Sequence, residues 1–326
     1  MAISGIGVLL GKRAFFFTFI AIVVISIFVL VFSTAVKPTG VEIQETSRAK
    51  VEVIDAYTKE LKDVQLPRAI TASSRAAIDS MLEYIYVNRE YMTNVQTNFS
   101  ELLLYGTLSG QPYPRMDSKC LKNWSDRVEN LSLEVLGIET HILFDGFSIY
   151  QTEPFSLQVE ADVQIKTNKS SISYNIQKRV QVNMSLIGML EPVSLYHDYN
   201  RTIMPTNITP TGWNVSTTRE FISKSQFRWN RYGEAPSFLM RLEGNLKGKS
   251  SCCGIESLLN GSVGNFNRSY VDYQYYNGTG DVCPLGIYVY NVSGITDHSI
   301  GSPGFRLDAQ HIGLYGLNET ETLSTC

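Results

Sequence analysis

The chain has 326 residues, of which 44% are hydrophobic and 18% are charged, and its formal net charge is −3. This composition is typical of a globular protein with a sizeable core, because disordered chains combine few apolar residues with a high net charge. The small net charge and the lack of long basic runs argue against a nucleic-acid partner and against a polybasic membrane-binding patch.

Residues 14–36 form a run of 23 residues without a charge, rich in Phe, Ile and Val. As a helix this run would be roughly 35 Å long, enough to cross a hydrocarbon core of about 30 Å. Lys12 and Arg13 precede the run, and the solitary Lys37 follows it. This bias predicts a cytoplasmic N-terminus at residues 1–13, a transmembrane helix at 14–36 in contact with membrane lipid, and an extracellular C-terminal domain.

A cleaved secretory signal is an alternative interpretation, because such signals also place basic residues before an apolar run. The run is longer than an ordinary signal core, and Ser33-Thr34-Ala35 is a poor cleavage site.

A third interpretation rests on Lys12-Arg13-Ala14 and the following Phe15-Phe16-Phe17-Thr18-Phe19-Ile20. This segment resembles the leader signal of archaeal type IV pilin precursors, although Ala21 stands where bacterial pilins carry Glu. The resemblance implies cleavage between Ala14 and Phe15 on the cytoplasmic side. The apolar helix would then serve as a membrane anchor and later as a filament core.

Asparagines in the N-glycosylation sequon Asn-x-Ser/Thr are unusually frequent, with 13 of the 19 asparagines in such positions. Roughly three would arise by chance, so a Ser/Thr/Asn-rich composition is the weaker explanation. The sequons predict a surface that carries N-linked glycans, beyond the membrane. The predicted sites are Asn98, Asn123, Asn130, Asn168, Asn183, Asn200, Asn207, Asn214, Asn260, Asn267, Asn277, Asn291 and Asn318.

The five cysteines agree with an oxidising compartment. We expect one of the adjacent Cys252 and Cys253 to bridge to Cys283, with Cys120 and Cys326 as candidates for the remaining bonds. The sequence does not fix the connectivity, and the odd count leaves one thiol free or intermolecular. A zinc site is the less favoured alternative, because no Cys-x-x-Cys or histidine spacing supports it.

Residues 41–105 are predicted to form a helical stalk. Apolar residues from Val51 to Val64 recur at three-four spacing with charges between them, and a second such stripe ends near Tyr105. Pro67 is expected to end or kink the helix. We favour helices that pack on each other or on the next domain over a coiled coil with a partner.

Residues 155–165 alternate strictly between apolar and polar, which predicts a half-buried strand. A turn at 167–170 and a second alternating run at 172–186 complete a hairpin. Farther on, 235–246 and 254–259 are expected to be short helices, 269–276 and 287–292 strands, and 305–317 a helix or a strand.

These elements predict an α+β fold. Long N-terminal transmembrane and stalk helices are followed at 120–326 by an antiparallel, β-rich, sandwich-like extracytoplasmic domain, with an α/β subregion from about residue 235.

The order of these parts resembles archaeal type IV pilin-like surface proteins. Residues 235–245, 254–260 and 305–308 are similar to stretches in members of that family. The resemblance implies membrane anchoring and filament assembly, and it implies no catalytic activity.

Residues with catalytic or ligand-binding chemistry are sparse. His141, His197, His298 and His311 have no metal-ligand spacing, and the sequence has no HExxH, GxSxG or nucleotide-binding motif. Asp162 with Glu160, and Asp272 with Asp281, are more simply explained as solvated positions than as catalytic pairs. We therefore predict a protein that is not an enzyme and that has no cofactor and no metal.

The favoured function is a structural one, a pilin-like subunit of an extracellular filament that self-assembles through its N-terminal hydrophobic helix. The alternative is a permanently anchored surface adhesin, receptor or coat glycoprotein, with residues 270–276 as a candidate contact surface. A viral envelope glycoprotein is a third interpretation of the sequon density.

Overall fold

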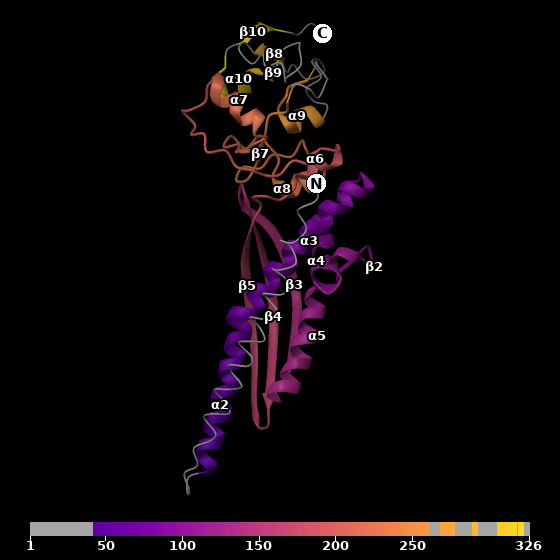
Figure 1. Cartoon of the computed structure of the whole chain (residues 1–326), viewed down its shortest axis with the longest axis vertical. Helices are drawn as coiled ribbons and strands as arrows, with labels where there is room; N and C mark the ends of the chain where they lie inside the picture. Colours follow the sequence, from indigo (N-terminus) through magenta and orange to yellow (C-terminus); the bar gives the residue numbers. More distant parts are fainter. Residues whose placement is uncertain (1–41, 261–267, 278–288, 293–304, 318, 323–326) are drawn as a thin grey trace, which may run out of the picture. The chain divides into compact units, whose positions relative to one another are not determined.

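A computed structural model describes residues 42–260, 268–277, 289–292, 305–317 and 319–322 (Figure 1). The chain divides into two compact units, residues 1–56 and residues 57–326. The described part of the first unit belongs to a single helix, α2 (Glu42–Glu60), whose last residues lie in the second unit.

The expected fold class is wrong for the described part of the chain. None of the helices built from these residues is long and apolar enough to cross a membrane. α2 has charged residues throughout its length, and α3 (Leu66–Asn88), although 23 residues long, carries Arg68, Arg75, Asp79 and Glu83. The predicted span at 14–36, with the leader site at Ala14 and Phe15, lies outside the described residues.

Helical backbone runs without interruption from residue 42 to residue 88. Between α2 and α3 lies one π-helical segment, η1 (Leu61–Gln65), directly before Pro67 in the first turn of α3. A proline has no N–H, so Pro67 cannot donate the regular i→i−4 hydrogen bond of an α-helix. The π-helical segment η1 lies at the point in the chain where this bond is missing. Pro67 therefore neither ends the helix nor starts a separate one. α3 ends where Arg89 adopts a left-handed conformation.

The predicted hairpin is present and is part of a three-stranded antiparallel sheet. Its strands are β3 (Glu139–Glu153), β4 (Ser156–Lys169) and β5 (Ile172–Ser185), in the order β3-β4-β5. Leu157, Val159 and Ile165 of β4 are buried, whereas Gln177 and Gln181 of β5 are exposed on the other face. The alternation of side chains thus gives the sheet one apolar and one polar face.

Helices, rather than a second sheet, cover the apolar face, so the expected sandwich is wrong. Residues of α3, α4 (Val95–Tyr105) and α5 (Leu121–Leu131) share one hydrophobic core with the sheet (Figure 1). Among them are Ile78, Met81, Phe99 and Leu121, which are wholly buried. The sandwich was expected because period-two strands reveal that one face is buried, but not whether helices or strands cover it.

The connections around this sheet are short. They comprise β1 (Thr107–Leu108), β2 (Gln111–Pro112), the 3-10 helix η2 (Pro114–Met116) and the π-helix η3 (Ser132–Leu136).

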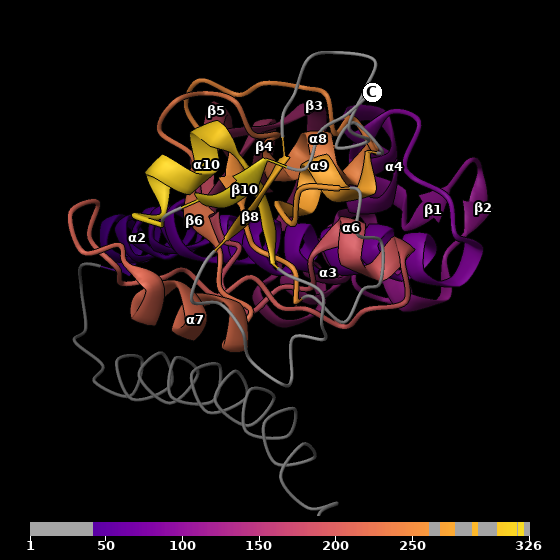
Figure 2. The ribbon, with the colours of Figure 1, turned by 90° about the horizontal axis from the view of Figure 1, so that it is seen from above.

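The C-terminal part of the second unit has a second core, in which Phe221, Tyr270, Phe305 and Tyr315 are buried. α10 (Ala309–Leu314) packs beside β8 (Val289–Val292), as Figure 2 shows, and beside β9 (Arg306–Asp308). The elements of this part are α6 (Pro192–Tyr196), α7 (Val215–Ser223), β6 (Arg228–Trp229), α8 (Phe238–Leu242), β7 (Ile255–Glu256), α9 (Asp272–Tyr276), β8 (Val289–Val292), β9 (Arg306–Asp308), α10 (Ala309–Leu314) and β10 (Glu319–Thr322).

Two local predictions in this part are wrong. The expected helix at 254–259 contains the strand β7, which pairs with β6, and the expected strand at 269–276 contains the helix α9. Short apolar or aromatic runs do not distinguish the two structures, so tertiary packing decides between them. The strand expected at 287–292 is present as β8, and the ambiguous run at 305–317 holds both β9 and α10.

Candidate functional site

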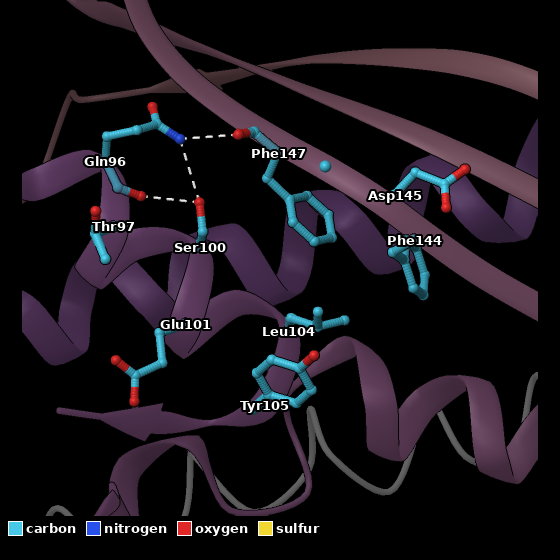
Figure 3. Close-up of a pocket in the computed structure, with 10 residues that line it drawn as sticks. Gln96, Thr97, Ser100, Glu101, Leu104, Tyr105, Phe144, Asp145 and Phe147 are labelled. Carbon is cyan, nitrogen blue, oxygen red and sulfur yellow. Dashed lines mark hydrogen bonds between the residues drawn. The ribbon is translucent and has the colours of Figure 1, made fainter. Parts of the chain in front are cut away.

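A groove of about 640 Å³ lies between α4 and β3 and is the strongest candidate for a binding surface (Figure 3). The register of β3 against β4 shifts between Phe144 and Gly146, which places a bulge there. Because of this extra residue, Phe144 and Phe147 both lie beside the groove, with ring centroids 5.6 Å apart. Tyr105 at the end of α4 is 62% exposed and adds a third aromatic ring.

Gln96 of α4 is fully used by the fold. Its side-chain nitrogen donates to the Phe147 carbonyl at 2.8 Å, and its side-chain oxygen accepts from the Ile149 N–H at 3.0 Å. The amide thus takes the place of a neighbouring strand and covers an edge that is otherwise open to pairing. Glu129 of α5 does the same at Ile142, whose N–H donates to the carboxylate at 2.9 Å.

Glu101, on the same side of the groove, is also occupied. Its carboxylate accepts hydrogen bonds from the Thr107 hydroxyl and from the N–H groups of Ser109 and Gly110, and so holds the β1–β2 turn. The three aromatic rings suit packing of an apolar or aromatic partner, and Asp145 of β3 adds one exposed carboxylate to the lining.

A buried ion cluster centred on Arg241 joins three short helices. The Arg241 guanidinium of α8 donates to Glu191, which precedes α6, at 3.1 Å, and to Asp272 of α9 at 3.0 and 3.2 Å. Burial alone would lower the pKa of Arg241, but the charges of Asp272 and Glu191 outweigh it and raise that pKa. The Ser257 hydroxyl donates to Asp272 at 2.7 Å and completes the cluster.

A second buried cluster surrounds His311 of α10. Its Nδ1 lies 2.7 Å from Asp308, and its Nε2 lies 3.3 Å from Glu256. Burial opposes the charge on His311, but Glu256 and Asp308 raise its pKa to about 10. Burial would raise the pKa values of Glu256 and Asp308, and the imidazolium instead lowers both. Tyr315 and Asn230 donate further hydrogen bonds to Glu256.

These two clusters hold groups that resemble catalytic ones, but they lie inside the protein. Arg241, Glu256 and His311 are at most 1% exposed. A substrate has no access to such groups without local unfolding, so we interpret both clusters as structural ion pairs. The sequence did not predict these clusters, and the interpretation of Asp272 as a solvated position is wrong, because Asp272 is 2% exposed. The only local signal was Asp308 three residues before His311, where the aspartate caps the first turn of α10.

Among the residues that the structure describes, the remaining histidines and carboxylates do not assemble into a site. His141 lies on β3 beside Glu129 and Glu139, and His197 stacks on Tyr276 with centroids 4.1 Å apart. His298 and Asp281 lie outside the described residues. Within the described ranges, no group of three or more His, Cys, Asp or Glu side chains is placed to hold a metal ion.

Asp162 and Glu160, considered above as a carboxylate pair, have separate partners on the polar face of the sheet. Arg179 binds Asp162 at 2.8 Å, and Glu160 accepts from Tyr150.

The cysteines differ from the expected pattern. Cys252 and Cys253 form a disulfide with each other, so neither of them bridges to Cys283. The α-carbons of Cys252 and Cys253 are 3.8 Å apart, which is closer than in most disulfides. A bond between adjacent cysteines is therefore uncommon and was not expected from their spacing. Cys120 is a buried free thiol. Cys283 and Cys326 lie outside the described residues.

The sequon asparagines whose side chains are described all reach the surface. Seven are exposed, and Asn98, Asn168 and Asn277 are half-buried. The exposed ones are Asn123, Asn130, Asn183, Asn200, Asn207, Asn214 and Asn260. Asn230 is the one buried asparagine of the described part, at 1% exposure, and it is not in a sequon. Asn267 and Asn318 lie outside the described residues, and the side chain of Asn291 on β8 is not described.

Comparison with known proteins adds no relative, since no protein-family model, curated protein or solved structure matches this chain.

Proposed function

We propose that this protein is a non-enzymatic glycoprotein of the cell surface, anchored at the membrane through the apolar residues 14–36. Its extracytoplasmic part is a subunit of a pilin-like filament that assembles through the same apolar segment. α3 and the three-stranded sheet share one hydrophobic core, and their order along the chain fits the helical stalk followed by a β-rich part on which the resemblance rests.

The number of accessible sequon asparagines is the observation that carries the proposal. A glycan is bulky and hydrated, so it attaches only to a side chain that reaches solvent. Every sequon asparagine with a described side chain is exposed or half-buried and so meets this requirement. Asparagines are mostly exposed in folded proteins, so the support comes from the share of asparagines in sequons, 13 of 19, together with this accessibility. Glycosylation in turn supports the extracytoplasmic location.

Mass spectrometry of protein from its native cell tests the proposal. We expect glycopeptides at the exposed sequons and a mature chain that begins at Phe15, together with filaments in images of the cell surface. A chain that retains Met1 and forms no filament would favour the fixed anchor over the filament subunit. Bare asparagines in native protein would refute the location as well as the function.

The contact surface expected at 270–276 is wrong, because Tyr270, Tyr273 and Tyr275 are buried in the second core. The groove between α4 and β3 instead favours the alternative of an anchored adhesin, receptor or coat protein. Exposed Tyr105 and half-buried Phe144 and Phe147 offer aromatic area, and such residues often dominate binding surfaces. Replacement of Tyr105 by Ser would then abolish adhesion or coat formation and leave the thermal midpoint unchanged. An unchanged cell-surface phenotype in this variant would exclude the groove as the binding site.

A further inference from the structure

A second groove, of about 500 Å³, lies where the β3–β4 turn meets the end of β5. Pro154 and Phe155 form the two-residue turn, and they line the groove together with Ile187. Pro154 and Phe155 are half-buried, and Ile187 is 51% exposed. The groove is open to solvent, and these three side chains give it an apolar surface.

A sequon asparagine lies in this groove. Asn183 of β5 is exposed and lines the groove, as does Ser185, the hydroxyl residue of the same sequon. In the sheet Asn183 pairs with Gln158 and Ser185 pairs with Ser156, so both side chains lie on the polar face. The groove between α4 and β3, in contrast, has no sequon asparagine in its lining.

We propose that the N-glycan on Asn183 folds back into this groove and covers Phe155 and Ile187, an inference that rests on the glycosylation in the proposed function. The side-chain nitrogen of Asn183 bonds to the anomeric carbon of a lipid-phosphate-linked oligosaccharide. The bond from that carbon to the phosphate oxygen breaks, the phosphate leaves with the electron pair, and the nitrogen loses one proton.

The chemistry of the groove matches the first sugar residues of such a glycan. One face of a pyranose ring presents C–H groups, which pack on aromatic and aliphatic surface such as Phe155 and Ile187. The ring hydroxyls need hydrogen-bond partners, and the exposed carboxylate of Glu153 and the hydroxyl of Ser156 line the same groove. Attachment at Asn183 makes the contact intramolecular, so little entropy is lost on docking.

The surface that the glycan would cover lies where hydrogen bonds join the β3–β4 turn to the residue after β5 and the end of β5 to α3. The Phe155 carbonyl accepts from the Leu186 N–H at 2.9 Å, and Arg75 of α3 donates to the Ser185 carbonyl at 3.4 Å. A glycan seated here shields apolar atoms and restrains the turn, and it thereby stabilises the folded state.

The test compares the thermal midpoint of the full chain made in a glycosylating cell with that of Asn183→Gln made in the same cell. We expect the variant to melt about 2–4 °C lower. Asn123→Gln, which removes a sequon on α5 away from this groove, is the matched control and should melt like the parent. In protein made without glycosylation, Asn183→Gln should change nothing, which separates the glycan from the side chain.

A second variant tests whether the glycan packs on Phe155. Phe155→Leu keeps an apolar side chain but removes the ring, and it should lower the midpoint more in glycosylated protein than in bare protein. An equal loss in both forms, or equal midpoints for Asn183→Gln and its glycosylated parent, overturns the inference. Mass spectrometry distinguishes the two proposals. A bare Asn183 beside occupied sequons refutes only this inference, whereas bare asparagines throughout refute the proposed function too.

Discussion

Replacement of Arg241 by methionine is the sharpest test of the structural interpretation of the buried clusters. Methionine keeps much of the volume of the arginine stem but removes its charge and every donor. Glu191 and Asp272, which are both about 2% exposed, would then face each other without a cation. Glu191 would still cap α6 through the N–H groups of Val193 and Ser194, and Asp272 would keep the Ser257 hydroxyl and the Tyr273 N–H, but neither carboxylate would have a cation.

Removal of one partner from a buried ion pair costs about 3–5 kcal/mol, because the other charge stays buried. Arg241 serves two carboxylates and also donates to the Ile255 carbonyl, so we expect the upper half of this range. The thermal midpoint should fall by about 10 °C or more. Chemical denaturation followed by circular dichroism, with and without the substitution, measures the free energy directly.

Two further variants make this prediction refutable. Adding Glu191→Gln and Asp272→Asn to Arg241→Met should recover part of the loss, because no buried charge then lacks a partner. Arg179→Met, which breaks an exposed pair with Asp162, should leave the midpoint unchanged. If Arg241→Met were as mild as Arg179→Met, the cluster would not hold the C-terminal core together, and an accessible role for it would have to be considered.

The remaining predictions concern pH dependence, close packing and the sheet edge. The folded-state pKa of His311, about 10, exceeds its ordinary value of 6.5, so its contribution is fully present below pH 6.5 and is lost as the pH rises to about 10. Urea titrations across this window should show a decline that is absent in a His311→Asn variant. Gly254→Ala should cost about 1–3 kcal/mol, because its new methyl group would lie 2.3 Å from the Ala235 carbonyl oxygen; Gly146→Ala, which meets no atom within 4 Å, should be near neutral by the same denaturation assay. Gln96→Ala should cost about 1–2 kcal/mol and promote aggregation detectable by light scattering, since it uncovers the edge of β3. Equal aggregation of this variant and its parent would contradict the assigned role of the amide.

Strong local patterns in the sequence were enough to predict the hairpin. Leu157, Val159 and Ile165 alternate with polar residues, and this periodicity alone sets which face of β4 is buried. The three-four spacing of 51–64 likewise falls on helical backbone. The sequence alone predicts N-glycosylation at the sequons, and the structure adds that their described side chains reach the surface.

The candidate site was not predictable from the sequence. Phe144 and Phe147 meet beside α4 because of a bulge, and a bulge depends on how two strands align rather than on local residues. The prediction of a second sheet on the apolar face of β3–β5 was wrong for a similar reason. An apolar strand face does not specify whether helices or strands pack on it.

The sequence by itself determined the helical and alternating segments, the uncharged run at 14–36 and the positions of the sequons, because each depends on residues that are near neighbours in the chain. Only the tertiary structure decided that Tyr-rich residues 272–276 form a helix and that Arg241 joins Glu191 to Asp272. Those outcomes depend on pairing across 31 to 50 residues of sequence, where burial and charge compensation outweigh local preference.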